Sequence, residues 1–519
     1  MCSQSESEYQ KPGWLFLSTI FVTGINVKCI FICSLAFIIL TACAVGPDYK
    51  KPPIAIPTSF TESTKQWKQA TPQDEQDRGT WWKIFHDNTL DALENQLNQC
   101  NQNIAVAFAQ YQQARAIVDE SRASFFPIVT GTMDITRQRT GSGSSSFIST
   151  SSTGTTSTGA ASTGVGGGGS THPVTTSHTL GLDVSWEPDL WGSIRRTVEA
   201  SEAGAESSAA LLGNTRLSMQ ASLAQYYFEL LALDKDQQIL DHAVIDYQKA
   251  LRLTQNRYKV GVAAQTDVIQ AKTQLESAKA LAINNKINRA QFEHAIAVLI
   301  DKPPEEFHIP AHPLNRLPPS IPINVPSTLL ERRPDIASAE RLMAEANAQI
   351  GIAIAAYFPT LTLSATASET HSNYSHWFSI PDLSWAIGPQ LAETILDGGL
   401  RQATVAAARY NYNATVATYK QTVLAAFQEV EDNLVSLKNL QQEYYVQNKA
   451  AINARLSLEL ITNQYKAGTS AYSDVITAQT TAYNAEKTAA DVAGLEMTSA
   501  VNLIKALGGG WENCDCSRA

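Results

Sequence analysis

Two stretches of the chain repeat each other: RYKVGVAAQTDVIQAKTQLE at positions 257–276 and QYKAGTSAYSDVITAQTTAY at positions 464–483. In each copy a Tyr-Lys pair precedes a glycine, Gly261 or Gly468, and an Asp-Val-Ile run follows it. Glycine allows a tight turn at the end of a helix, and a carboxylate at the start of the next helix can cap its exposed N–H groups. Each stretch therefore predicts a helix end, a turn and a second helix.

The repeat extends over most of the chain. NIAVAFAQYQQARAIVDESRASFFP at 103–127 parallels DIASAERLMAEANAQIGIAIAAYFP at 335–359, and WGSIR at 191–195 parallels DGGLR at 397–401. Self-similarity of this kind predicts two copies of one structural unit, which we place at residues 81–310 and 331–507.

Each unit contains an unusually long stretch without helix-breaking proline. Residues 193–260 contain no proline, and residues 400–467 contain neither proline nor glycine. Helices over these ranges would be roughly 100 Å long at 1.5 Å per residue, a length that requires packing against neighbouring helices as in a coiled coil. Shorter return helices are expected at 266–300 and 473–507.

Four short segments alternate apolar and polar residues, at 128–138, 178–188, 359–368 and 383–391. In the clearest of them Leu180, Leu182, Val184 and Trp186 share one face of a strand. About ten residues is the length of a transmembrane β-strand with an apolar outer face, although a small soluble sheet also alternates. Four strands are too few to close a barrel, so a membrane barrel would be shared, and three chains would give twelve strands.

A Gly/Ser/Thr-rich tract, residues 141–170, lies between the first two predicted strands. Such a composition is typical of a flexible domain linker. Its position inside one hairpin favours a long external loop, which is usual for outer-membrane barrels.

The N-terminal region has the layout of a secretory signal. Lys28 precedes the apolar run CIFICSLAFIIL, and Leu40-Thr41-Ala42-Cys43 follows in the pattern of a bacterial lipobox. We therefore expect residues 1–42 to be removed, with residues 1–27 an over-extended start, and Cys43 to carry N-acyl and S-diacylglycerol groups. An uncleaved anchor or an ordinary thiol are the alternatives. Residues 43–80 would form a lipidated linker, and residues 508–519 a C-terminal tail.

Composition excludes several classes of function. The 519 residues carry a formal net charge of −10, which argues against nucleic-acid binding. Outside the signal and Cys43, the cysteines are Cys100, Cys514 and Cys516, too few for a disulfide framework or a four-ligand zinc site. The Cys-Asp-Cys tail could bind a metal weakly, but we interpret it as frayed. The sequence contains no P-loop, H-E-x-x-H or G-x-S-x-G motif, so no enzyme, metal site or bound cofactor is predicted.

Four blocks resemble a known family: CAVGPDYKKP at 43–52, WWKIFHDNTLDAL at 81–93, ERRPDIASAE at 331–340 and ALGGGW at 506–511. They occur in the order typical of outer-membrane efflux lipoproteins of the NodT type, within the TolC-like family. The resemblance implies a homotrimer in the outer membrane of a Gram-negative bacterium, in which a twelve-stranded β-barrel, four strands per chain, continues into a periplasmic α-helical barrel. It further implies the passive exit channel of a tripartite pump for drugs or other small toxic solutes, together with a periplasmic adaptor and an inner-membrane transporter of the resistance-nodulation-division type.

The resemblance also implies where the channel is contacted and gated. The helix tips would dock the adaptor through Tyr258, Lys259, Val260, Gly261, Val262, Tyr465, Lys466, Ala467, Gly468 and Thr469. Gate candidates are Ser473, Thr477, Asp474 and Asp267, although capping of the following helix is the simpler role for the two aspartates. Related pumps often have Leu-Asp-Ala-Gln where this chain has Ile-Thr-Ala-Gln at 476–479. Because Thr477 replaces that aspartate, we expect weaker cation selectivity.

The sequence leaves two alternatives to the efflux channel, one with the same architecture and one of a different class. A type I protein-secretion duct would share the helices and strands, although the lipobox and the Arg-Arg-Pro-Asp block favour efflux. A non-conducting coiled-coil envelope lipoprotein would need no strands, so the four alternating segments argue against it.

Overall fold

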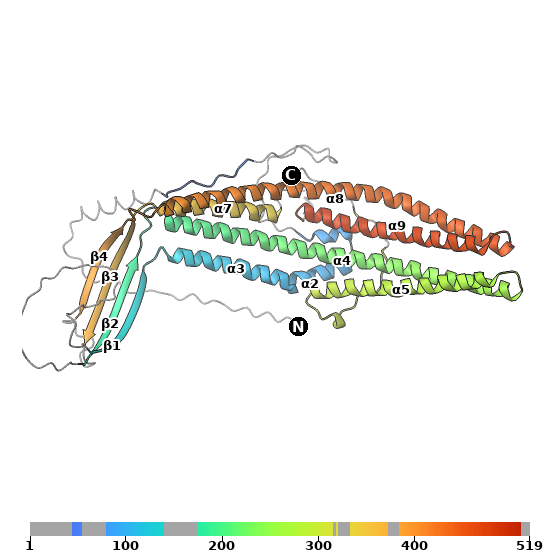
Figure 1. Cartoon of the computed structure of the whole chain (residues 1–519), viewed down its shortest axis with the longest axis horizontal. Coiled ribbons are helices and arrows are strands. Elements are labelled where there is room, and N and C mark those ends of the chain that lie inside the picture. The colour runs from blue at the N-terminus through green and yellow to red at the C-terminus, as the bar shows by residue number, and fades with distance from the viewer. Residues whose placement is uncertain are drawn as a thin grey trace, which may run out of the picture.

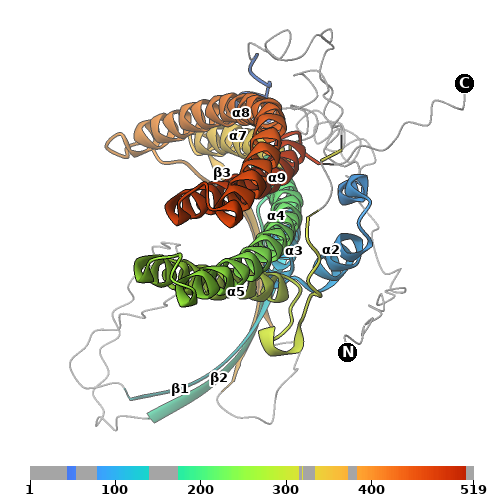
Figure 2. The same ribbon diagram turned by 90° about the vertical axis from the view of Figure 1, so that its right-hand side faces the viewer.

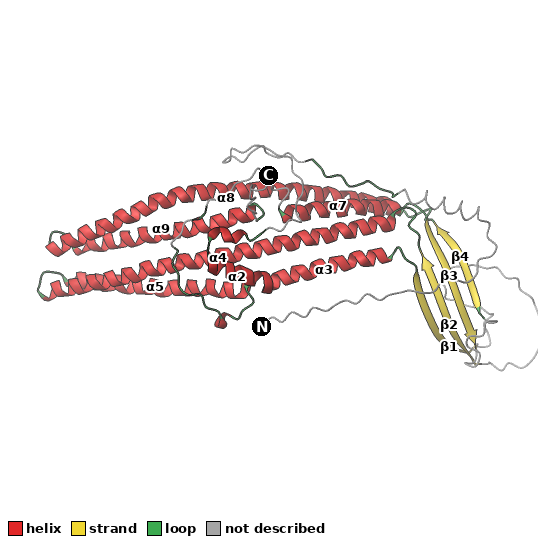
Figure 3. Cartoon of the chain, turned by 180° about the vertical axis from the view of Figure 1, so that it is seen from behind, coloured by secondary structure: helices red, strands yellow, loops and turns green. Residues whose placement is uncertain are grey.

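The computed structural model describes residues 44–53, 79–139, 174–314, 318–319, 333–371 and 383–509. The chain is elongated, with a β-sheet at one end and long helices extending from it (Figure 1; Figure 3 shows it from behind). Its elements are η1 (Trp81–Phe85), α2 (Asn88–Cys100), α3 (Gln102–Ala123), β1 (Ile128–Arg139), β2 (Val174–Trp186), α4 (Ser193–Lys259), α5 (Gln265–Leu299), η2 (Pro304–Glu306), α7 (Pro334–Ala355), β3 (Thr360–His371), β4 (Ser384–Ala392), α8 (Leu400–Ala467) and α9 (Tyr472–Ala506).

The long helices form two hairpins. Helices α4 and α8 contain 67 and 68 residues, close to the proline-free ranges that predict them, and each reaches about 100 Å from the sheet to the far end. Helices α5 and α9, of 35 residues each, return along them, and Figure 2 shows the two hairpins side by side when the far end faces the viewer. Within the described residues no helix is long and apolar enough to cross a membrane.

Both long helices begin with the same local structure, a glycine with left-handed backbone angles preceded by an aspartate that caps the helix. Gly192 and Gly399 adopt left-handed backbone angles, with φ of 84° and 92°. Asp189 accepts hydrogen bonds from the backbone N–H groups of Ile194 and Arg195 at 3.2 and 2.9 Å. Asp397 caps α8 in the same manner, accepting from the N–H of Arg401 at 3.2 Å and from its side chain at 2.7 Å. These caps fix the start of each long helix a few residues after the preceding strand ends.

The sheet is an antiparallel meander in the order β1-β2-β3-β4. Strand β2 begins four residues earlier than the alternation predicts, because residues 174–177 pair with residues 136–139 of β1. It ends at Trp186 because Pro188 has no N–H to donate to a ladder. Pairing of β2 with β3, from His178–His371 to Trp186–Leu363, joins the two repeats into one sheet.

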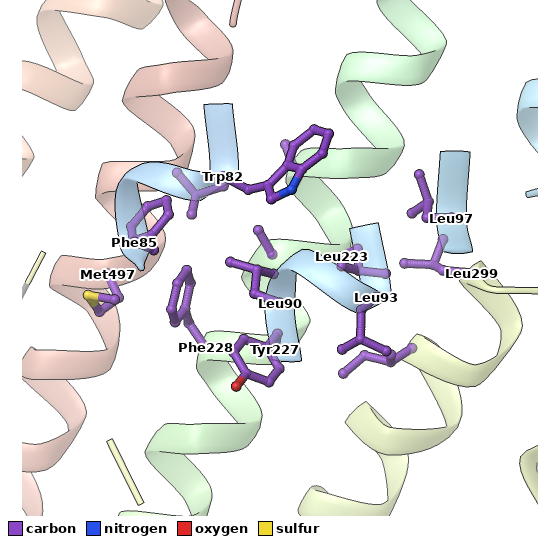
Figure 4. Close-up of a cluster of buried hydrophobic side chains, with 14 of the residues drawn as sticks. Trp82, Phe85, Leu90, Leu93, Leu97, Leu223, Tyr227, Phe228, Leu299 and Met497 are labelled. Carbon is purple, nitrogen blue, oxygen red and sulfur yellow. The ribbon is translucent and has the colours of Figure 1, made fainter. Parts of the chain in front are cut away.

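A hydrophobic core lies midway along the helices (Figure 4). Trp81, Trp82 and Phe85 of η1 are buried against α4, and the Phe85 ring lies 4.8 Å from that of Phe228. Asp87 then caps α2 by accepting from the N–H of Thr89 at 2.9 Å and of Leu90 at 3.2 Å. The aromatic side chains of the Trp-Trp-Lys-Ile-Phe block are therefore buried against α4 and hold the start of α2 beside the long helices.

The Arg-Pro-Asp block at the start of α7 has a structural role. Arg333 donates to Asp335 at 2.7 Å, to Glu429 of α8 at 2.7 Å and to the carbonyl oxygen of Ala506 in α9 at 2.8 Å. Arg333 is thus paired with two carboxylates, whereas Arg332 lies outside the described residues. One arginine thus ties three helices of the second repeat together.

The N-terminal segment, residues 44–53, crosses both repeats. The N–H of Val45 donates to the carbonyl of Trp191 at 3.0 Å, and Arg196 of α4 donates to Asp48 at 2.7 Å. Tyr49 donates to Glu340 of α7 at 3.0 Å. Gly46, with φ of 106°, lies so close to α7 that an added Cβ would come 2.5 Å from the Cα of Gly351, which explains why a glycine is needed in the Val-Gly-Pro-Asp-Tyr block.

Candidate functional site at the helix tips and the sheet

The two tips have the same backbone. At the first, the N–H of Val262 donates to the carbonyl of Arg257 and the N–H of Gly261 to that of Tyr258, both at 2.9 Å. At the second, Thr469 and Gly468 make the equivalent bonds to residues 464 and 465, both at 3.0 Å. This is a Schellman motif, whose left-handed position favours glycine, and φ is 76° at Gly261 and 82° at Gly468.

Asp267 and Asp474 both occupy the third position of the helix that follows the turn. Asp474 accepts from the Ser470 hydroxyl at 2.8 Å and from the N–H of Ala471 at 3.2 Å. These hydrogen bonds, the Ser470 bond first, lower the pKa of Asp474 below its usual value. Asp267 accepts from the N–H of Ala264 at 3.4 Å. Both aspartates therefore cap helices, which is the simpler of the two roles that the sequence suggests.

The exposed surfaces of the tips differ. Tyr258, Val260 and Val262 of the first tip are 46%, 73% and 63% exposed. Lys466, Ala467 and Thr469 are also exposed at the second tip, but Tyr465 is 4% exposed. The sequence-predicted tip residues are thus brought together at one end of the molecule, where the first turn presents an apolar surface and the second a small, polar one.

Tyr465 is buried because the first hairpin covers it. Arg257 donates to the backbone oxygen of Tyr465 at 2.6 Å and to that of Lys466 at 3.3 Å, and its guanidinium lies 4.6 Å from the centre of the Tyr465 ring. The Tyr472 ring also packs against the Tyr465 ring, with ring centres 5.4 Å apart, and burial raises the pKa of Tyr472 to about 12. A cation at the C-terminus of α8 also stabilises the helix dipole.

The sequence pattern places Arg257 at the tip but does not predict this contact between hairpins. The repeat aligns Arg257 with Gln464, next to Tyr465. Two hairpins packed side by side in the same direction would bring these positions close together. The repeat alignment therefore contained a signal for the contact, provided that the packing of the hairpins was considered.

The gate candidates of α9 share one exposed face at the start of the helix. The Ser473 hydroxyl donates to Asp474 at 3.3 Å, and the Thr477 hydroxyl donates to the carbonyl of Ser473 at 2.9 Å. This face carries hydroxyl groups and the single carboxylate of Asp474. The fourth candidate, Asp267, belongs to the other hairpin.

The sheet has one apolar face across all four strands. Antiparallel register places the apolar residues of neighbouring strands opposite each other, as in the pairs Val184–Ala365 and Ala365–Ile387. Trp385, Ile387 and Leu391 are 69%, 75% and 66% exposed. The apolar face comprises Val129, Met133, Ile135, Leu180, Leu182, Val184, Trp186, Leu361, Leu363, Ala365, Ala367, Trp385, Ile387, Pro389 and Leu391. Threonine, serine and aspartate dominate the opposite face, so one face of the sheet is apolar and the other is polar.

Within the described ranges, no group of three or more His, Cys, Asp or Glu side chains is placed to hold a metal ion. Cys100 is half-buried at the end of α2. Cys43, the tract 141–170 and the Cys-Asp-Cys tail lie outside the described residues.

The comparisons with known proteins agree with this geometry. The chain matches the family model described as outer membrane efflux protein over residues 93–300 and 325–509. It is 29% identical over 481 residues to the antibiotic efflux pump outer membrane protein ArpC of Pseudomonas putida, and the match covers 91% of this chain and 94% of that protein. It is 25% identical over 474 residues to the cation efflux system protein CusC of Escherichia coli (strain K12), covering 91% and 97% of the two chains.

Solved structures show the same fold. The outer-membrane channel OprN is 28% identical, with a TM-score of 0.76, and the match covers 90% of this chain and all of that one. The open-state MtrE outer membrane channel of Neisseria gonorrhoeae is 25% identical, with a TM-score of 0.72 over 90% of this chain and 98% of the other. The match to the family model spans both repeats, and the chain therefore belongs to the outer membrane efflux protein family.

Proposed function

We propose that this protein is the outer-membrane exit channel of a tripartite efflux pump and conducts drugs or other small toxic solutes passively out of the periplasm. The observation that carries the proposal is that one chain combines an exposed apolar sheet face with very long helices. A four-stranded sheet exposes an apolar face, and helices of about 100 Å extend from it. A large exposed apolar surface marks contact with lipid or protein, and the helices are long enough to reach deep into the periplasm.

The apolar sheet face would contact the lipid of the outer membrane. Its strands contain 9 to 13 residues, which suits a tilted transmembrane strand. A sheet of four strands leaves two open edges, and unpaired backbone groups at an edge are not tolerated in lipid. Three chains would remove these edges by joining their sheets into a twelve-stranded barrel with a polar lumen.

Exposed apolar side chains along the helices support the homotrimer. On α8 these include Tyr410, Leu424, Val446, Ile452, Leu456 and Leu460, each more than half exposed. Burial of such residues against neighbouring copies would contribute about 25 cal/mol per Å² of apolar surface. The same association would close the helices of three chains into one periplasmic barrel.

The N-terminal segment supports lipidation of Cys43. Ala44, the next residue, lies against the start of α4, where an added Cβ on Gly192 would come 2.8 Å from the Ala44 Cα. This contact fixes the segment at the junction between sheet and helices, which is the membrane boundary in our proposal. Acyl groups on Cys43 would therefore be at the correct height to enter the bilayer, and two or more chains suffice for stable anchoring.

The helix tips would dock the periplasmic adaptor, which connects the channel to an inner-membrane transporter of the resistance-nodulation-division type. The exposed Val260 and Val262 supply an apolar surface for this contact. Ser473, Asp474 and Thr477 of α9, with Asp267 of α5, would surround the narrowest part of the pore. With a threonine at 477, the constriction depends more on helix packing than on charge.

Native mass spectrometry of the detergent-extracted outer-membrane protein tests the assembly. We expect a trimer in which each chain begins at Cys43 and carries acyl mass. The same preparation should form ion-conducting channels in planar lipid bilayers. A monomer that keeps the residues upstream of Cys43 and does not conduct would contradict the proposal.

A further inference from the structure

The charged side chains of the sheet are sorted between its two faces. Successive residues of a strand point to opposite faces, and the register assigns each residue to one of them. The polar face carries Asp134 of β1 and Asp183 of β2, both exposed. The apolar face carries every arginine and histidine of the described strands and one glutamate: Arg137, Arg139, His178, Glu369 and His371. Cations on a lipid-facing surface are costly near the middle of the bilayer, so their position along the strands is informative.

All the basic residues of the apolar face lie at the end of the sheet away from the helices (Figure 1). Strand β1 begins at Ile128, next to α3, so Arg137 and Arg139 lie at its far end. The register places His178 opposite His371 and diagonal to Arg137. Diagonal neighbours across two antiparallel strands are about 7–8 Å apart, within reach of a long side chain. The four residues therefore form one continuous patch, which we call the basic rim.

The basic rim begins where the apolar surface of β1 ends. Val129, Met133 and Ile135 are each more than half exposed on the apolar face, and Arg137 follows on that face about 7 Å beyond Ile135 along the strand. Trp385, at the same end of β4, is 69% exposed. Aromatic side chains of this kind gather at the boundary between lipid and water. The rim therefore lies at the level of lipid headgroups when the apolar face is in the membrane.

The two arginines of the rim are available for a ligand. Both are exposed, and within the described ranges neither makes an ion pair or a side-chain hydrogen bond. His371, in contrast, lies 3.8 Å from Glu369, and His178 is buried. Strand β4 would lie beside β1 of the next copy in a shared barrel, and its nine residues contain no carboxylate. Arginine can rest its apolar stem on the sheet while its guanidinium reaches a headgroup.

We propose that Arg137 and Arg139 bind the phosphate groups of an outer-leaflet lipid on the outside of the sheet. The proposal rests on the proposed function, in which the apolar face contacts the lipid of the outer membrane. A guanidinium matches phosphate geometry with two parallel hydrogen bonds, and the outer leaflet of a Gram-negative outer membrane consists of phosphorylated glycolipid. Asp134 and Asp183 repel phosphate from the polar face, so the lipid is held on one face only. The bound lipid would fix the height of the sheet in the bilayer.

Native mass spectrometry of the detergent-extracted full-length protein, titrated with bis-phosphorylated lipid A, tests this proposal. The double variant Arg137→Gln with Arg139→Gln should raise the dissociation constant for lipid A by about tenfold or more, because charged hydrogen bonds are lost. Dioleoylglycerol, which has no phosphate, should bind the parent protein and the variant alike. The pair Arg137→Lys with Arg139→Lys keeps the charge without the paired geometry and should bind lipid A within about threefold of the parent protein.

Two controls separate the rim from bulk charge and from free phosphate. Arg216→Gln with Arg252→Gln removes two exposed arginines of α4, a matched loss of charge, and should leave the affinity for lipid A unchanged. Inorganic phosphate should not displace lipid A at equal concentration, since it lacks the acyl chains that contact the apolar face. Displacement by inorganic phosphate would mean that the rim is a site for the free anion, and the proposal would be wrong.

The same spectra separate the possible failures. If Arg137→Gln with Arg139→Gln binds lipid A as tightly as the parent protein, or if the α4 control loses as much affinity, the proposal is wrong. It is also wrong if the rim variant dissociates into monomers before lipid is added, because the arginines would then hold neighbouring copies together. If the parent protein binds lipid A through the two arginines but is a monomer that does not conduct, the lipid site is supported and the proposed channel function fails.

Discussion

The two helix tips share one backbone but present two surfaces. Both use a glycine in a Schellman motif and an aspartate that caps the next helix. At the first tip Tyr258, Val260 and Val262 are exposed, whereas at the second the tyrosine is buried beneath Arg257. The difference shows how a duplicated unit can diverge in role. Identical turns keep the geometry, and a few side chains give one tip an exposed apolar surface and the other a tyrosine buried against the neighbouring hairpin.

The largest effect is expected from breaking the contact that buries Tyr465. Arg257→Ala removes a charged hydrogen bond of 2.6 Å and the contact with the Tyr465 ring. A hydrogen bond to a charged group contributes about 1.5–3 kcal/mol, so the open probability in planar bilayers should rise by about tenfold or more. The matched control is Gln464→Ala at the equivalent position of the second hairpin, which should behave as the parent protein. If the open probability of Arg257→Ala equals that of the parent protein, the contact between Arg257 and Tyr465 does not hold the channel closed.

The second effect concerns the surface of the first tip. Val260→Ala with Val262→Thr gives it the residues found at the second tip, Ala467 and Thr469. The exchange removes apolar surface worth about 1–2 kcal/mol on burial, so the affinity for the periplasmic adaptor of the pump should fall by about tenfold. Surface plasmon resonance with the purified adaptor measures this change. The control, Thr469→Val, alters the other tip. Equal affinities of the parent protein, the double variant and this control for the adaptor would mean that the adaptor does not use the first tip.

A smaller effect should follow from adding charge to one hairpin. Thr477→Asp would introduce three carboxylates in a trimer, and the cation-to-anion permeability ratio should increase severalfold if they face the pore. The reversal potential in a potassium chloride gradient reports this ratio. Gln270→Asp, at the equivalent exposed position of α5, is the matched control and should have less effect. An unchanged reversal potential for Thr477→Asp would show that this face of α9 does not line the constriction.

Local pattern predicts most of the fold but few of the contacts between its parts. The absence of proline indicates the long helices, the glycine-aspartate spacing indicates both turns, and alternation indicates four strands. The pairing of β2 with β3, the Arg257–Tyr465 contact and the close approach of Gly46 to Gly351 were not predicted. Each joins residues more than 170 positions apart, and helical or strand periodicity carries no information about such partners. The repeat carries part of the information about these distant partners, because it implies that the two hairpins are arranged alike.

The smallest effect is a pH dependence that should distinguish the two caps. Asp474 accepts hydrogen bonds from Ser470 and Ala471, and these lower its pKa in the folded protein. A carboxyl group whose pKa is lower in the folded state stabilises that state above its unfolded pKa, about 3.9, and loses this contribution as the pH falls through the folded pKa. The ionised Asp474 carboxylate should therefore stabilise the second tip at about pH 5 and stabilise it less at about pH 2, where more of it is protonated.

Pepsin, which is active in acid, can detect this loosening as cleavage within the second tip. Asp474→Asn lacks the charge at every pH, so its cleavage should depend less on pH than that of the parent protein. Asp267→Asn provides the comparison, because Asp267 accepts the longer bond of 3.4 Å from Ala264 and its side chain has no equivalent of the Ser470 contact, since residue 263 is alanine. Cleavage of the second tip that is equally fast at both pH values in the parent protein would mean that the Asp474 cap does not hold the turn. The tips would then differ in their exposed side chains alone, with no difference in how their turns are stabilised.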